Sequence, residues 1–145
     1  AFITPVIWFT YFFSSFATKL LADSHIACRL DFPVDLPAIP LEAQKRHELF
    51  LVFKESLNNV IKHAAATEVR IALAWVDQVI HLTIEDNGRG FVVPEAAASK
   101  GNGLPNMHNR LQRVGGRVVI QSELGRGTRV EIVLPVNSQP EEKRK

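Results

Sequence analysis

Two periodicities in the order of apolar and polar residues divide the chain into elements. Over 42–65 the apolar residues recur at helical spacing and form one broad stripe, which predicts a long amphipathic helix. Elsewhere apolar and polar residues alternate, as in half-buried β-strands. This alternation predicts five strands, at 26–32, 68–76, 79–85, 117–121 and 128–134.

The segments between these elements indicate how the strands are connected. Short turns at 77–78 and 122–127 predict two β-hairpins, whereas the prolines of 33–40 exclude a helix or central strand there. A short helix is expected over 104–114, after a long glycine-bounded loop. This order favours an α/β (α+β) two-layer sandwich, in which three helices cover one face of a mixed, mostly antiparallel sheet.

The first eighteen residues form an uncharged, strongly apolar segment with two interpretations. A transmembrane helix needs about 20 such residues, but Pro5 and several hydroxyl side chains interrupt this one. It also lacks the positively charged start of a signal peptide. We favour a packed helix, and a membrane segment is the alternative. The predicted organisation is an N-terminal apolar helix over 1–25, a domain over 26–136 and a flexible tail over 137–145.

Composition narrows the class of protein. The 145 residues fit one globular domain, with 46% hydrophobic and 22% charged residues. A net charge of +2 gives no reason to expect nucleic acid as a partner. The single cysteine, Cys28, excludes an internal disulfide framework and suits a reducing compartment. We therefore expect a cytoplasmic domain.

Polar side chains on the long helix are the first candidates for chemistry. Glu55, Asn59, Lys62 and His63 fall on one stripe opposite the apolar face. The stripe has an ordinary interpretation, a solvated helix face. However, asparagine is a weak helix former in mid-helix, and a carboxylate and an amide four residues apart suit Mg²⁺.

Two glycine-rich segments are the other candidates. Asp86 ends a strand and is followed by Gly88 and Gly90. The segment could be a simple turn, or its carboxylate could accept a hydrogen bond from an exocyclic amine such as that of adenine. Gly101 and Gly103 lead into a helix N-terminus, which favours phosphate. The chain contains neither a Walker A motif nor a Rossmann fingerprint.

Taken in order, these segments resemble the histidine-kinase-like (GHKL) ATPase superfamily, which has the Bergerat-type fold. The closest resemblance is to sensor histidine kinases whose partners are LuxR/NarL-type response regulators. Residues 54–64 resemble the family's N box, 86–91 its G1 box and 101–107 its G2 box, and 125–128 resemble its last glycine-rich turn. The likeness covers about 26–136. His108 and Asn109 depart from the pattern, where this subfamily usually has Arg and Glu.

The resemblance implies ATP and Mg²⁺ as ligands and gives each candidate residue a role. The catalytic and metal-binding pair would be Asn59, which ligates Mg²⁺, and Glu55, which assists. Gly88 and Gly90 would be hinges of a lid over about 91–100. The remaining contacts would be made to phosphates by Lys62, His63, Gly101, Gly103 and Leu104, to the adenine amine by Asp86, and to adenine through water by Thr128.

The resemblance also implies that the chemistry is divided between domains. The phosphoacceptor histidine would lie in a separate dimerising helical domain upstream. We reject His47 for this role, because it lies at the start of the long helix. The isolated chain is therefore expected not to autophosphorylate. A response regulator would be reached through the full-length kinase, and a membrane only through upstream regions. The alternatives are an ATP-hydrolysing switch of the same fold, an anti-sigma-factor-type serine kinase, or a catalytically silent nucleotide-binding module.

Overall fold

The computed structural model describes residues 5–34, 36–37, 39–93 and 103–136. Gly101, most of the predicted lid and the predicted tail over 137–145 lie outside these residues. In chain order the described elements are α1 (Pro5–Leu21), β1 (Ala27–Asp31), α2 (Ala43–Asn59), a π-helical turn η1 (Val60–Ala64), β2 (Glu68–Val76), β3 (Val79–Asp86), α4 (Leu104–Arg113), β4 (Arg117–Ser122) and β5 (Thr128–Pro135).

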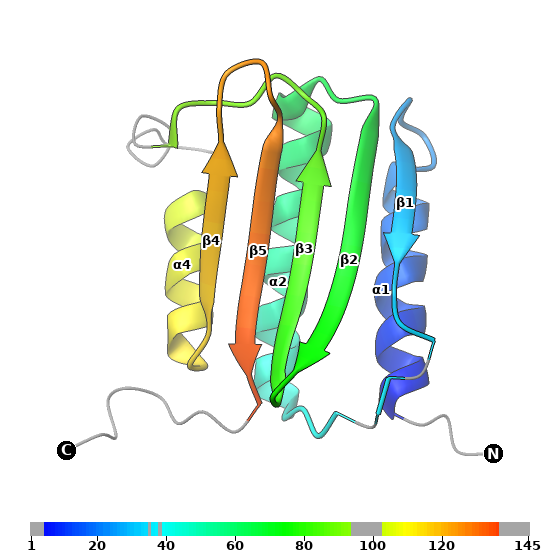
Figure 1. The fold of residues 1–145 in the computed structure, drawn as a ribbon, viewed down its shortest axis with the longest axis vertical. Helices are drawn as coiled ribbons and strands as arrows, with labels where there is room; N and C mark the ends of the chain where they lie inside the picture. Colours follow the sequence, from blue (N-terminus) through cyan, green and yellow to red (C-terminus); the bar gives the residue numbers. More distant parts are fainter. Residues whose placement is uncertain (1–4, 35, 38, 94–102, 137–145) are drawn as a thin grey trace.

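The five strands form one sheet in the order β1-β2-β3-β5-β4. Strand β1 runs parallel to β2, and the other neighbouring pairs are antiparallel. Figure 1 shows that α1, α2 and α4 all lie behind the sheet, on the same face. The expected two-layer sandwich with a mixed, mostly antiparallel sheet is therefore confirmed.

The core lies between this face of the sheet and α2. Alternate residues of the central strands face the helices, and Leu82 of β3 and Ile132 of β5 are fully buried. Leu49, Phe53 and Leu57 of α2 are fully buried against them. Each such side chain contributes about 1.5–3 kcal/mol through burial. The sheet that carries the site is thus held by the apolar stripe that the sequence predicts.

Helix α1 packs against the same core. Phe13 is buried, and its ring centroid lies 4.8 Å from that of Phe53 in α2. Phe16 contacts Phe50 in the same way, with ring centroids 4.9 Å apart. No helix among the described residues is long and apolar enough to cross a membrane.

The long helix differs from its prediction at its C-terminal end. The α-helix ends at Asn59, and a π-helical turn continues to Ala64 before Ala65 takes a left-handed conformation with φ of 51°. A π-turn has wider spacing than an α-helix, so the predicted stripe does not extend unchanged to Lys62 and His63. Apolar periodicity could not reveal this, because Val60 and Ala64 are buried all the same.

Candidate functional site

Asp86 lies at the end of β3 and is 7% exposed. Strand register places it opposite Thr128 of β5, which in turn lies opposite Ser122 of β4. The Asp86 carboxylate accepts a 2.8 Å hydrogen bond from the Gly88 N–H and another from the Thr128 N–H. Burial raises the pKa of Asp86 above its usual value, although these two backbone bonds act in the opposite direction. The result is a fixed, nearly buried carboxyl group.

A cavity of about 510 Å³ lies at this end of β3, β4 and β5. Asp86, Ser122 and Thr128 line it together with Ile120 and Arg126. Its volume is within the usual range for small-molecule sites. The structure therefore brings the predicted adenine contacts, Asp86 and Thr128, into one cavity.

The glycines of the predicted G1 box lie against backbone atoms of other segments. A Cβ at Gly88 would lie 2.1 Å from the Ala64 carbonyl oxygen of the π-turn. A Cβ at Gly90, whose φ is +65°, would lie 1.9 Å from the Glu123 carbonyl oxygen. The structure thus gives both glycines a packing role that the sequence argument missed. Their role as hinges stays a prediction.

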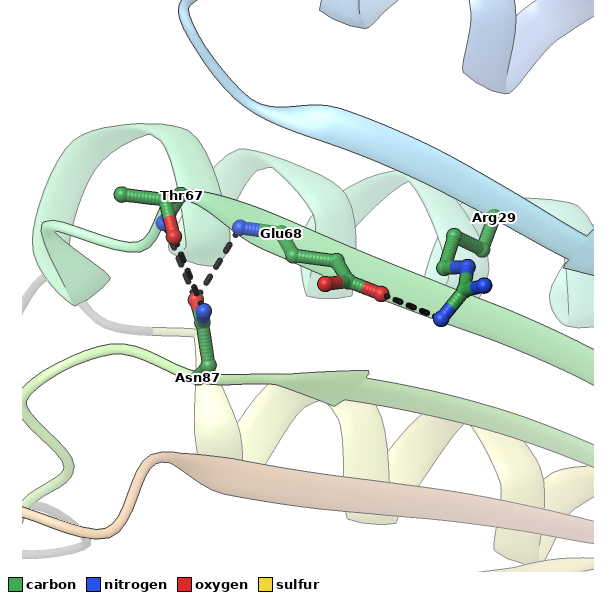
Figure 2. A network of polar contacts seen from close by, with 4 residues as sticks. All are labelled: Arg29, Thr67, Glu68 and Asn87. Carbon is green, nitrogen blue, oxygen red and sulfur yellow. Dashed lines mark hydrogen bonds and ion pairs between the residues drawn. The ribbon is translucent and has the colours of Figure 1, made fainter.

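Asn87, the residue after Asp86 in the chain, fixes the start of β2 (Figure 2). Its Oδ1 accepts hydrogen bonds from the Thr67 N–H at 2.9 Å and the Glu68 N–H at 3.0 Å, and its Nδ2 donates to Thr67 Oγ1 at 2.9 Å. The Glu68 carboxylate pairs with Arg29 of β1 at 3.3 Å. The sequence marked Asn87 only as part of a motif, although asparagine commonly bonds nearby backbone groups.

A second cavity, of about 360 Å³, lies between α2 and α4. Glu55 and Gly103 line it, and a Cβ at Gly103 would lie 2.3 Å from Glu55 Oε1. Gly103 caps the N-terminus of α4 with φ of 75°, and Leu104 begins the helix and is buried. Only glycine lets the Glu55 carboxylate approach the helix start this closely.

An ion pair missed by the sequence argument joins the same two helices. Arg110 of α4 lies 3.3 Å from the carboxylate of Glu48, which is 8% exposed. Glu48 follows His47 in the chain. Because its carboxylate is paired with Arg110, we interpret it as a structural residue rather than as the acidic member of a phosphoacceptor His-Glu pair. No sequence signal marked the two residues as partners, because their contact depends on how α4 packs.

The remaining predicted site residues lie apart from these two cavities. Asn59 is half-buried at the end of α2, whereas Lys62 and His63 are exposed on η1. None of the three lines either cavity. Gly101 lies outside the described residues.

Glu55 and Asn59 fit a hard cation. Both carry oxygen atoms and lie one turn apart on α2. Mg²⁺ needs only a few protein oxygens when water and phosphate complete its ligands. Among the described residues no group of three His, Cys, Asp or Glu side chains could hold a metal alone. The protein's own oxygens thus suit an ion that arrives with a nucleotide.

Comparison with known families decides the class. Residues 44–138 match the model of the histidine kinase-, DNA gyrase B- and HSP90-like ATPases. The chain belongs to this ATPase family. The expected membership of the histidine-kinase-like ATPase superfamily is thereby confirmed.

Sensor kinases are among the relatives of this ATPase domain. The chain is 31% identical to the sensor histidine kinase LiaS of Bacillus subtilis over 126 residues, covering 87% of the chain and 34% of LiaS. It is 37% identical over 110 residues to the histidine-protein kinase/phosphatase UhpB of Salmonella typhimurium, covering 76% of the chain and 21% of UhpB. The chain thus spans about a third or less of these proteins.

Solved structures agree on the fold. The histidine kinase domain from a blue-light activated kinase of Erythrobacter litoralis superposes with a TM-score of 0.70 at 20% identity, covering 90% of the chain and 62% of that structure. The Acinetobacter baumannii kinase AdeS gives 0.71 at 19% identity, covering 88% and 65%.

Proposed function

We propose that this ATPase domain binds Mg-ATP and presents the γ-phosphoryl group to a histidine in a separate helical domain. The observation that carries the proposal is that Asp86 and Thr128 line the same cavity. The Asp86 carboxylate is held there by two backbone N–H groups. Such a carboxylate recognises an amine by accepting its hydrogen bond. The names of the relatives support transfer to histidine rather than to water.

Each residue of the site has a part in this proposal. Asp86 accepts a hydrogen bond from the adenine amine, and Thr128 supports adenine through water. Glu55 and Asn59 hold Mg²⁺, which when bound neutralises charge on the phosphate oxygens. The remaining phosphate contacts come from Lys62, His63, Gly101, Gly103 and the start of α4 at Leu104.

Phosphoryl transfer needs mainly positioning and electrostatics, so two domains can share it. In this proposal the chain supplies the nucleotide, and an upstream dimerisation domain supplies the imidazole. A response regulator of the LuxR/NarL type then receives the phosphoryl group, as the resemblance of the four motif segments implies. The domain works in the cytoplasm, and any membrane anchor belongs to other parts of the full-length protein.

The test combines nucleotide binding with transfer of a label. Calorimetry should detect Mg-ATP binding to the chain, and ATP labelled at its γ-phosphate should leave no label on the chain alone. Label should appear on an added phosphoacceptor domain from a kinase of this subfamily. Rapid release of inorganic phosphate without any acceptor would favour the ATP-hydrolysing switch instead. If the chain does not bind ATP at millimolar nucleotide, the proposal is wrong.

A further inference from the structure

The side chain of Asn87 takes the place of a backbone peptide where the pairing of β2 with β3 ends. The register stops at Val69 and Asp86, and the next N–H, that of Asn87, still donates to the Glu68 carbonyl oxygen at 3.3 Å. In a continuing antiparallel ladder the Glu68 N–H would return this bond to the Asn87 carbonyl. It donates to the Asn87 side-chain oxygen instead, at 3.0 Å (Figure 2). The side-chain amide thus completes the ladder and allows the backbone to leave the sheet.

The backbone that leaves the sheet turns back on Asp86. The Gly88 N–H donates to Asp86 Oδ1 at 2.8 Å, two residues along the chain, which is an Asx turn. The next N–H, that of Arg89, donates to the Ala64 carbonyl oxygen of η1 at 2.7 Å. Asn87 lies inside this turn. Its side chain therefore holds the turn to β2, while the following peptide holds it to η1.

Asn87 itself is exposed and is not among the residues that line the cavity at Asp86. It can therefore influence a ligand of that cavity only through the backbone. If the turn opens, the Gly88 N–H leaves the Asp86 carboxylate, which then loses one of the bonds that orient it. A site that is correctly formed for only a fraction of the time binds with proportionally lower affinity.

We propose that Asn87 is a positioning residue whose side-chain amide replaces a peptide at the end of β3 and so holds the turn over 86–88 in the shape that binds the nucleotide. This role rests on the proposed function and deepens it, since it belongs to a residue outside the cavity. Thr67 is the partner of Asn87, because its N–H and its hydroxyl supply two of the three side-chain contacts.

Amide hydrogen exchange, measured by NMR and corrected for intrinsic rates, tests the turn without any ligand. Gly88 is the reporter, since its N–H bonds to Asp86 and not to Asn87. Asn87→Ala removes the side-chain bonds to β2, and the protection of the Gly88 N–H should fall about fivefold, the effect of one lost hydrogen bond. Arg29→Met is the matched control. It removes the other contact in Figure 2, the pair with Glu68, and should leave Gly88 unchanged.

Asn87→Asp tests whether the hydrogen bonds themselves matter. The oxygens of an aspartate still accept from the N–H groups of Thr67 and Glu68, and the Thr67 hydroxyl can rotate to donate to them. This variant should therefore keep most of the protection of Gly88. Thr67→Val removes only the hydroxyl and should act in the same direction as Asn87→Ala but more weakly. It should add nothing to Asn87→Ala, and it is the substitute variant if Asn87→Ala does not fold.

Calorimetry connects the turn to binding. Affinity for ATP and for adenosine should fall about fivefold in Asn87→Ala and should be largely retained in Asn87→Asp. A loss of overall stability alone does not lower affinity while the chain stays folded, which circular dichroism verifies. The combination of a loss in Asn87→Ala and its rescue in Asn87→Asp therefore indicates positioning.

Each of three outcomes would overturn a different statement. Unchanged protection of Gly88 in Asn87→Ala would show that Asn87 does not hold the turn. Reduced protection with wild-type affinity for ATP and adenosine would show that the turn is held but does not position the site. A wild-type chain that binds neither ligand would overturn the proposed function itself, and the role of Asn87 in binding with it.

Discussion

The cavity at Asp86 and the cavity at Glu55 are held by different kinds of contact. The first is walled by neighbouring strands whose backbone groups bond one another, and backbone N–H groups hold the Asp86 carboxylate. The second lies between two helices that are joined by side chains, with Glu55 against Gly103 and Arg110 paired with Glu48. The cavity proposed to recognise the base is thus built into the sheet, whereas the cavity proposed for the phosphate side depends on the placement of α4.

The largest expected effect comes from breaking the turn beside Asp86. Gly127 has φ of +80°, and a Cβ there would lie 2.1 Å from the Asp86 carbonyl oxygen. Gly127→Ala should therefore cost more than about 3 kcal/mol of unfolding free energy and abolish ATP binding. Urea unfolding and calorimetry measure the two effects.

Gly125→Ala is the matched control for this change. Gly125 has nearly the same φ, +82°, but nothing lies within 4 Å of an added Cβ. Only the backbone strain remains, about 1 kcal/mol. Equal losses of stability in the two variants would show that close packing beside Asp86 is not what requires glycine.

Removing the charge of Asp86 should weaken ATP binding without disturbing the other cavity. Asp86→Asn keeps the shape but replaces one acceptor oxygen with a donor facing the amine. Loss of a charge-assisted hydrogen bond predicts a fall in ATP affinity of roughly ten- to a hundredfold. The enhancement of binding by Mg²⁺ should be unchanged in calorimetry, and wild-type affinity in the variant would contradict the assignment.

The raised pKa of Asp86 also predicts a dependence of stability on pH. Because the folded chain holds this proton more tightly than the unfolded chain, the contribution of Asp86 to stability falls as pH rises from 3.8 through the raised value. On acidification from neutral pH to about pH 4, the wild type should gain unfolding free energy relative to Asp86→Asn. Urea titrations of both proteins across this range give the difference, and an opposite slope would contradict it.

Some elements of the fold and the site could be predicted from the sequence, and others could not. The alternation of β3 and β5 and the apolar stripe of α2 specify elements locally, so the sheet and the helices on one face could be predicted. The glycines and Asp86 marked a nucleotide site through the pattern of its motifs. The bonds of Asn87 and the pair of Glu48 and Arg110 depend on strand register and helix packing, which no local pattern encodes.

Substitution of Asn59 tests the proposed contacts to Mg²⁺ and the phosphates, as substitution of Asp86 tests the proposed contact to the base. It ends the α-helical part of α2, one turn after Glu55. Asn59→Ala should weaken the Mg²⁺-dependent part of ATP binding about tenfold. Adenosine, which lacks phosphates, should bind equally to both proteins in calorimetry. A matching loss of adenosine affinity would show that Asn59 supports the fold of the site rather than the metal.

The smallest expected effect comes from the ion pair between α2 and α4, which has a natural control elsewhere in the chain. The same 3.3 Å separates Arg110 from Glu48 and Arg29 from Glu68. The side chain of the acidic partner is 10% exposed in the first pair and 39% in the second. Burial leaves Glu48 less able to exchange its partner for water, so only the first pair should matter to stability.

Arg110→Met should therefore lower the unfolding free energy by about 1 kcal/mol, a value that allows for the partial exposure of Arg110. Arg29→Met should change it by less than about 0.5 kcal/mol. Since Arg110 also lines the phosphate-side cavity, its loss should weaken ATP binding a few-fold while adenosine binding stays the same. Equal effects of the two substitutions on stability would show that burial of Glu48 does not matter. A loss of adenosine affinity in Arg110→Met would mean that the two cavities are not independent, because the placement of α4 would then also govern the end of the sheet at Asp86.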